Sequence, residues 1–305
     1  MIGAVMLALA VTAGSAVEHA GLSDASAGIA LDDLHFVVAN DEHNRLVVYR
    51  RGLPGALHEV DLGSFLGAKK EADIEGSARI GQRIYWIASH ARNAKGKLRE
   101  DRQRFFATDV IPGNGTPTLR PAGRPYTGLL ADMIASPALA ALKLGEAAEL
   151  APELDGGFNI EGLAEGPHGS LLIGLRNPLR HGRALLIPLL NPAELIVAGG
   201  GPARFGPAIA LDLGGLGVRS LERLTDGSYL IAAGLPGDGG SFRLFHWSGS
   251  ATTPPQGVPL DLGSLRPEGL FVWPDGRLTL LSDDGAQFKE LPEAQQRFRA
   301  VELRR

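Results

Sequence analysis

One hairpin-like pattern occurs five times along the chain, and this repetition limits the possible folds more than any other feature. The stretch from Asp24 aligns without a gap to the stretch from Asp73, 49 residues later, and three further copies begin at Asn159, Val218 and Arg266. The four later copies each contain a short strand, a glycine-bearing turn and an apolar strand; their turns are Gly81-Gln82, His168-Gly169, Asp226-Gly227 and Asp275-Gly276. This order is typical of β-hairpins.

Further strand-like runs follow most copies, for example Arg45–Tyr49, Phe105–Val110 and Phe242–Trp247. Four antiparallel strands per unit, repeated radially, predict an all-β fold, a five-bladed β-propeller. The longest interval between copies contains the segment 128–150, whose composition predicts a short helical insertion between blades two and three. A degenerate sixth blade in this interval is the alternative. The last copy lacks an obvious fourth strand, so residues near Val17–Leu22 are expected to supply it and close the ring.

The N-terminal run 1–13 is almost wholly apolar and is followed by the small residues Gly14, Ser15 and Ala16. This pattern predicts a signal peptide over 1–16, with cleavage after Ser15 or Ala16, and therefore a periplasmic or secreted protein. No Lys or Arg precedes the run, so a buried first strand is the alternative. No linker divides the rest of the chain, which predicts a single propeller domain over 17–305.

Composition excludes several classes of function. Lys and Arg together number 30 and Asp and Glu 34, so the net charge is -4, which argues against a nucleic-acid partner. The absence of cysteine excludes disulfides, thiolate metal sites and cysteine nucleophiles. No later segment is apolar enough to span a membrane, and phosphate-loop, serine-hydrolase, zinc-protease and EF-hand motifs do not occur. We expect a monomer whose partner is a small anionic molecule.

The first strand of each unit is expected to line the central channel, so a residue that recurs at its start faces a common axis. Counting back six or seven residues from the turns, together with the gapless alignment, selects Ser26, Glu75, Glu161, Ser220 and Glu268. Oxygen ligands without His or Cys favour a hard cation, most simply Ca²⁺. Glutamates that are solvated in the channel or bridge neighbouring blades are the alternative. In blade four, Glu222 competes with Ser220 because it has the same strand parity.

Polar residues at the ends of the second strands are expected to surround the five residues that face the axis. Hairpin pairing places Arg176 opposite Glu161 and Asp283 opposite Glu268. For an anionic substrate, the candidate binding residues are Arg176, Asn177, Arg92 and Asp41, and the candidate acid and base residues are Asp283, Asp284 and His90. The basic loop 92–104 contains Glu100 and Asp101 and no aromatic residue before Phe105, which predicts a solvated loop.

Three runs carry a resemblance to known families: DIEGSARIGQRIYWIASHARN, NIEGLAEGPHGSLLIGLRNPL and PEGLFVWPDGRLTLLSDDG. They resemble an uncharacterised family of bacterial secreted β-propellers, akin to the esterase-like phytase group, over essentially the whole mature chain. The order Ser-Glu-Glu-Ser-Glu is similar to the central calcium site of the calcium-activated nucleotidases (apyrases), which are five-bladed propellers. This second resemblance implies that Ser26, Glu75, Glu161, Ser220 and Glu268 form a calcium shell. It does not extend beyond these five residues.

These observations together predict an exported calcium-binding propeller that hydrolyses a phosphoester or phosphoanhydride. In this hypothesis the metal polarises a phosphoryl oxygen and orients water. A non-catalytic propeller, whose ion only stabilises the blades and whose rim binds a ligand or protein, is the second hypothesis. Hydrolysis of a lactone or ester at the same metal is the third.

Overall fold

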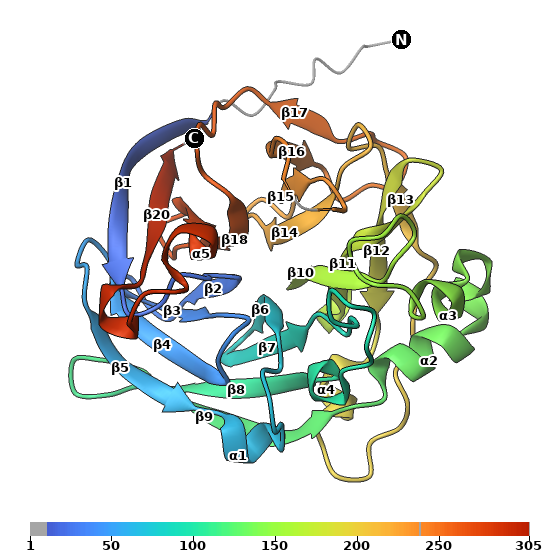
Figure 1. The fold of residues 1–305 in the computed structure, drawn as a ribbon, viewed down its shortest axis with the longest axis horizontal. Helices are drawn as coiled ribbons and strands as arrows, with labels where there is room; N and C mark the ends of the chain where they lie inside the picture. The colour runs from blue at the N-terminus through green and yellow to red at the C-terminus, as the bar shows by residue number, and fades with distance from the viewer. Residues whose placement is uncertain (1–10, 238, 305) are drawn as a thin grey trace.

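The computed structural model describes residues 11–237 and 239–304, in which twenty strands form five four-stranded antiparallel sheets. The sheets are arranged as blades around a central axis (Figure 1). The five-bladed β-propeller predicted from the repeat is therefore confirmed, and the six-bladed alternative is excluded. Within these residues no helix is both long and apolar enough to cross a membrane.

Each blade is numbered from its innermost strand outward. Blade one contains β2 (Ala27–Ala30), β3 (His35–Ala39), β4 (Arg45–Arg50) and β5 (Ala56–Asp61), and blade two contains β6 (Ile74–Ile80), β7 (Arg83–Ala88), β8 (Phe105–Ile111) and β9 (Thr118–Tyr126). Blade three contains β10 (Asn159–Glu165), β11 (Leu171–Arg180), β12 (Arg183–Leu189) and β13 (Ile209–Leu211). Blade four contains β14 (Gly217–Arg223), β15 (Tyr229–Gly234), β16 (Arg243–Trp247) and β17 (Gln256–Val258).

Blade five is built from both ends of the chain. Its inner strands are β18 (Pro267–Val272), β19 (Leu278–Ser282) and β20 (Arg297–Arg304), and its outermost strand is β1 (Thr12–Ala20). β1 pairs with β20 in antiparallel register and closes the ring, as the missing fourth strand predicted. β1 begins within the predicted signal peptide 1–16, the first ten residues of which lie outside the described residues. Cleavage after Ser15 or Ala16 would leave the pairing of Val17–Ala20 with Arg297–Ala300.

The hydrophobic core consists of five clusters, one between each pair of neighbouring blades. Because both faces of a blade pack against another blade, second strands such as β3 and β15 are buried at every position. The predicted insertion contains α2 (Leu129–Ala135), a 3₁₀ turn (Pro137–Leu142) and α3 (Leu144–Ala147). Its apolar side chains Leu129, Met133 and Leu144 extend the cluster between blades two and three.

The glycines that follow Glu75 and Glu161 bring neighbouring blades close together. A Cβ on Gly76 would lie 2.9 Å from Leu163 Cβ in blade three, and a Cβ on Gly162 would lie 2.8 Å from Val218 Cγ1 in blade four. Contacts this short do not leave room for a side chain. The Glu-Gly pairs in the sequence therefore combine a polar residue at the axis with a packing requirement one residue later.

The remaining helices are short and lie in the loops. They are α1 (Gly63–Leu66), α4 (Pro192–Leu195), α5 (Gly285–Phe288) and the 3₁₀ turns Glu100–Arg102, Pro167–Gly169 and Glu293–Gln295. The loop between β7 and β8, the loop between β5 and β6, and the segment after β19 lie at the same end of the blades as the starts of the inner strands. We call this end of the propeller the channel mouth.

Candidate metal centre at the channel mouth

A β-bulge at the start of the inner strand defines the axial position in four blades. The pairing of inner and second strands shifts by one residue at Glu75, Glu161, Arg219 and Glu268. A residue that is left out of the pairing in this way is re-aimed relative to its neighbours. These four side chains therefore occupy equivalent positions at the channel mouth.

In blade four the axial position is held by Arg219, not by Ser220. Ser220 is the first paired residue after the bulge and lies opposite Ala232, as Gly76 lies opposite Ile87 in blade two. Ser220 is therefore equivalent to the glycine that follows the axial residue in the other blades. Its hydroxyl oxygen accepts a hydrogen bond from the backbone N–H of Leu270 in blade five, at 3.0 Å. The prediction differed by one residue because six and seven were both accepted as the distance from the turn.

Blade one has no bulge at this place. Its inner strand pairs regularly from Ala27, and Gly28 packs against Leu281 of blade five. Ser26 is buried, and its backbone N–H donates to the carbonyl of Ala39 at 3.2 Å. Blade one therefore contributes no carboxylate from its inner strand, and its acidic groups come from the adjoining loops instead.

Arg219 neutralises two of the predicted calcium ligands. Its Nε lies 3.2 Å from Glu161 Oε2, and its Nη2 forms an ion pair with Glu268 Oε1. Glu161 also accepts hydrogen bonds from Arg176 Nη1 and Asn159 Nδ2, both at 2.9 Å. Glu161 and Arg219 are each only 4% exposed, so these charges interact in a medium of low effective dielectric constant. Glu161 and Glu268 therefore bridge neighbouring blades through Arg219, as in the alternative considered from the sequence, and do not form an open ring of oxygen ligands.

Three further carboxylates lie close together at the mouth. One oxygen from each of Asp41, Asp73 and Glu75 lies within 4.8 Å of the other two. Asp73 is bonded to the Ser89 hydroxyl and lies 2.7 Å from Arg102 Nη1. Asp41 Oδ1 is buried, and no hydrogen-bond donor among the described residues reaches it. We call Asp41, Asp73 and Glu75 the acidic triad.

The triad is electrostatically unfavourable when all its members are ionised. Burial raises the pKa of Asp41 well above its ordinary value, and the Asp73 carboxylate raises it further. Burial likewise raises the pKa of Glu75 well above its usual range, with the carboxylates of Asp73 and Glu161 next in effect. Groups in this situation take up protons or hold a cation. Oxygens within 4.8 Å of one another fit a hard ion such as Ca²⁺, whose ligands lie about 2.3–2.6 Å away.

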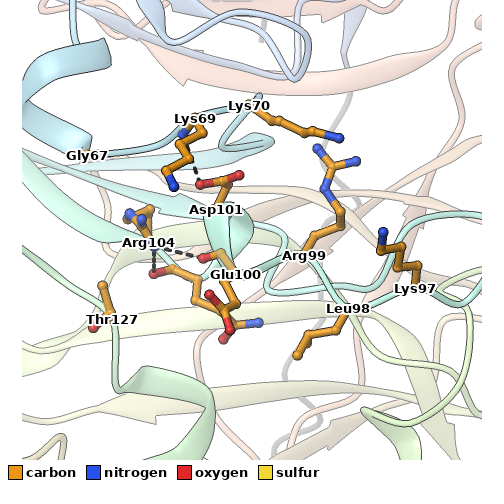
Figure 2. A pocket seen from close by; sticks show the side chains of 11 residues that line it. Gly67, Lys69, Lys70, Lys97, Leu98, Arg99, Glu100, Asp101, Arg104 and Thr127 are labelled. Carbon is orange, nitrogen blue, oxygen red and sulfur yellow. Dashed lines mark hydrogen bonds between the residues drawn. The ribbon is translucent and has the colours of Figure 1, made fainter.

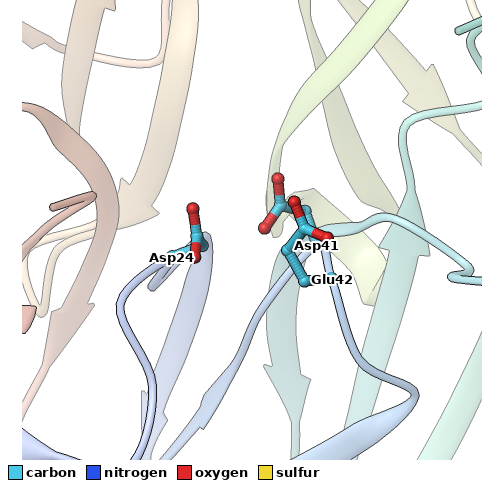
Figure 3. A group of neighbouring side chains, drawn as sticks. All are labelled: Asp24, Asp41 and Glu42. Carbon is cyan, nitrogen blue, oxygen red and sulfur yellow. The ribbon is translucent and has the colours of Figure 1, made fainter. Parts of the chain in front are cut away.

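A second acidic group shares Asp41 with the triad. Asp24, which precedes β2, faces Asp41 and Glu42, which follow β3 (Figure 3). Asp24 and Glu42 also line a small cavity of about 170 Å³ together with Lys289. Burial raises the pKa of Asp24, while the Ser23 hydroxyl, which donates to it at 2.6 Å, lowers it. Asp41 is therefore the residue through which the two acidic groups meet.

Several predicted rim residues are engaged in structural bonds. Arg92 Nε donates to the carbonyl of Ala148, and its Nη2 pairs with Glu149. These two contacts fix the end of the helical insertion to the loop between β7 and β8. Asn177 Nδ2 donates to the carbonyls of Pro152 and Leu154. The carboxylate of Asp284 is fully buried against Arg299.

The two other candidates for proton transfer differ in their surroundings. His90 is 2% exposed, its Nδ1 lies 2.8 Å from the carbonyl of Ala88, and burial lowers its pKa to about 4. The ring is therefore neutral at pH 7 and does not fit the role of a general acid. Asp283 lies at the mouth near Asp24, and burial raises its pKa. It can hold a proton at a higher pH than an ordinary aspartate.

Asp24, Asp73 and Arg219 are the site residues that sequence reasoning did not select. Asp24 and Asp73 lie two residues before Ser26 and Glu75, and Asn159 stands at the same place before Glu161. This recurring polar residue could have identified Asp24 and Asp73 from the sequence. Arg219, at seven residues before its turn, matches the spacing of Glu161 and Glu268.

Comparison with known proteins adds a partial family match. Residues 142–262 match a family described as "Protein of unknown function (DUF3616)". The match covers less than half of the chain and contains blade three, blade four and the end of the insertion. No curated protein matches the chain.

Several solved structures are similar to this chain at low sequence identity. An aldose sugar dehydrogenase with bound PQQ from Streptomyces coelicolor is 15% identical, with 97% of this chain and 98% of that chain covered and a TM-score of 0.48. A GH43_1 enzyme from Xanthomonas citri is 12% identical, with 95% and 90% covered and a TM-score of 0.48. At these identities the likeness concerns the fold alone.

Proposed function

We propose that this chain is a calcium-dependent hydrolase of small phosphoesters or phosphoanhydrides, with the ion held by the acidic triad. The observation that carries the proposal is the buried oxygen of Asp41, which lacks a donor among the described residues and lies beside Asp73 and Glu75. An ion at this place would offset the burial and the mutual repulsion that together raise the pKa values of Asp41 and Glu75.

The residues around the triad supply the other parts of such a reaction. When bound, Ca²⁺ would polarise a phosphoryl oxygen and orient a water molecule. Asp283, whose pKa is raised by burial, would be the proton donor to the leaving group. Arg219 and Arg176 keep Glu161 and Glu268 paired, so that these carboxylates do not compete with the triad for the ion.

Calcium binding to chelator-treated protein tests the metal site directly by isothermal titration calorimetry. Replacing Asp41 by Asn or Glu75 by Gln removes one charged ligand, and we expect either change to weaken binding about tenfold or more. Asp155→Asn, at an exposed position that belongs to neither acidic group, is the matched control and should bind as the wild type does. Asp24→Asn should weaken binding less than Glu75→Gln; the reverse order would assign the ion to the second acidic group.

Phosphate release on a panel of nucleotides, sugar phosphates and inositol phosphates tests the reaction. We expect activity that requires Ca²⁺, is lost in Glu75→Gln and is retained in Asp155→Asn. Asp283→Asn should lower kcat more than it lowers calcium affinity, because it removes a proton donor and not a ligand. Absence of turnover by calcium-loaded wild-type protein across the panel would contradict the proposal.

A structural ion in a non-catalytic propeller is the second candidate. Arg92, Asn177 and Asp284 are bound to the protein itself, so fewer groups are free to contact a substrate than the sequence predicted. In this case Ca²⁺ would raise the melting temperature of the wild type but not of Glu75→Gln, with no phosphate released from any substrate. The two candidates therefore give different results in the same pair of assays.

We also propose that the protein is exported. The support is the apolar run 1–13 followed by Gly14, Ser15 and Ala16. Mass spectrometry of the protein recovered from the periplasm or medium should give an N-terminus at Ala16 or Val17. Recovery of an uncut chain from the cytoplasm would contradict export.

A further inference from the structure

A second cavity, with five basic residues among the eleven that line it, lies outside the acidic triad. Its volume is about 680 Å³, and it lies between the segment that follows α1 and the loop between β7 and β8. We call it the basic hollow. Lys69 and Lys70 line it from one segment and Lys97 and Arg99 from the other, as Figure 2 shows. The remaining lining residues are Gly67, Leu98, Glu100, Asp101, Gln103, Arg104 and Thr127.

The hollow carries an excess of positive charge in a protein whose net charge is -4. Five of its lining residues are basic and two are acidic. Arg99 is paired with Glu71, but no ion pair involves the ammonium groups of Lys69, Lys70 or Lys97 within 11–237 and 239–304. Three lysines therefore remain available to an anion that enters the hollow.

The walls of the hollow are held in place by hydrogen bonds. Arg104 is buried, and its guanidinium donates to the carbonyls of Leu66, Glu100 and Gln103 at 2.8–3.0 Å. The backbone N–H of Lys69 donates to Asp101 Oδ1 at 3.0 Å, which joins the two segments across the hollow. The two segments that form the walls are therefore held in place before a ligand binds, which limits the ordering entropy spent on their backbone.

We propose that the basic hollow binds a small molecule bearing two or more phosphate groups. Lysine and arginine are the side chains that recognise phosphate oxygens, and the volume is that of an ordinary small-molecule site. A nucleic acid fits less well, because no aromatic side chain lines the hollow and the chain as a whole is acidic. Leu98 supplies one apolar contact for the non-phosphate part of the ligand.

The hollow and the triad are connected by a row of charged side chains. Arg99 pairs with Glu71, Glu71 lies 3.4 Å from Arg102, and Arg102 lies 2.7 Å from Asp73 of the triad. The proposal does not rest on the function proposed above, since it concerns a different site and an anion rather than a cation. The tests below are made without divalent metal so that the two proposals can fail separately.

Titration of full-length protein with pyrophosphate in the presence of a chelator tests the hollow. We expect saturable binding that weakens about tenfold or more in the double variant Lys69→Gln/Lys97→Gln, because two charge-assisted contacts are lost. Lys95→Gln, an exposed lysine of the same loop that does not line the hollow, should bind pyrophosphate as the wild type does. Sulfate, with fewer charges, should bind more weakly than pyrophosphate.

Four results would overturn the proposal. Pyrophosphate that does not bind the wild type at millimolar concentration, or that binds the double variant equally well, would show that the hollow is only a solvated surface. Sulfate that binds more tightly than pyrophosphate would exclude a phosphate ligand. Loss of pyrophosphate binding in Glu75→Gln would move the anion to the channel mouth. The single variant Lys70→Gln, with an unchanged melting temperature, repeats the test if the double variant does not fold.

Discussion

Glu222 is a half-buried acidic residue at the end of the channel opposite the mouth. Its Oε1 accepts a hydrogen bond from the backbone N–H of Val272 at 3.2 Å, which joins the inner strands of blades four and five. Burial raises its pKa from 4.5 to about 8. It lines a cavity of about 250 Å³ with Arg79 and Glu165. The sequence offered Glu222 as an alternative axial residue, and its role in the structure is to bridge two blades.

The raised pKa of Glu222 makes a prediction about stability. Between pH 4.5 and pH 8 the folded state binds more protons at this residue than the unfolded state, so the free energy of unfolding falls as the pH rises. Glu222→Gln keeps the acceptor for Val272 and removes the titration. We expect the variant to exceed the wild type in melting temperature by a few degrees at pH 8 and by much less at pH 5. An equal difference at both values would contradict the assignment.

Close packing at the axis makes a second prediction at the scale of the residue. A Cβ on Gly76 would lie 2.9 Å from both Leu163 Cβ and Ile87 Cγ2, so Gly76→Ala should lower the free energy of unfolding by about 1–3 kcal/mol. Gly55→Ala is the control, because a Cβ there meets no atom within 4 Å and its φ is not positive. Urea unfolding of both variants checks this, and equal midpoints would contradict it.

At the scale of the element, β1 is held by contacts at its C-terminal end. His19 is buried, stacks on Phe298 and meets Phe36 and Tyr49 edge to face. The hydroxyl of Tyr49 donates to the carbonyl of Ala20 at 3.0 Å. The strand that completes blade five is therefore anchored in the interface with blade one.

The burial of His19 makes this anchor sensitive to acid. Its pKa is lowered from 6.5 to about 4, so between these values the unfolded state binds more protons and stability falls as the pH is lowered. We expect His19→Phe, which keeps a ring at this position, to lose less stability than the wild type between pH 6.5 and pH 4. Thermal melts across this range measure the difference. Parallel losses in the two proteins would show that His19 does not contribute, since buried His90 titrates in both.

At the scale of the whole molecule, the ring depends on one pairing between its two ends. β1 contributes the outermost strand of blade five, and without it β20 would present an unpaired edge. Deletion of residues 2–20 should therefore lower the melting temperature and promote association. Deletion of residues 2–10, which retains β1, is the control. Equal melting temperatures and monomeric elution of both deletions on size-exclusion chromatography would contradict the role of β1.

The blade count and the insertion could be predicted from sequence because both depend on local pattern. Four of the five turns carry a glycine, and each copy lies one blade from the next, so the repeat counts the blades directly. Strands were harder to recognise where the turn signal was weak. β9 (Thr118–Tyr126) was not predicted, because it contains Gly123 and two prolines. β20 (Arg297–Arg304) was not predicted either, because it is separated from β19 by α5 and a loop.

The candidate site was predicted only in part. Glu75 and Asp41 were selected and lie together in the acidic triad, and the predicted contact between Arg176 and Glu161 is present. Ser220 was displaced from the axis because a bulge of one residue exchanges the faces of a strand. A count along the sequence does not reveal a bulge.

The sequence alone determined the type of fold, the number of blades and the location of polar residues at one end of the inner strands, since these follow from short-range patterns. The tertiary structure decided which of those polar residues pair with one another. Arg219 meets Glu161 and Glu268, which are 58 and 49 positions away in the chain, and thereby removes both from the set of free carboxylates. Whether a charge is paired or available depends on neighbours that only the closed ring brings together.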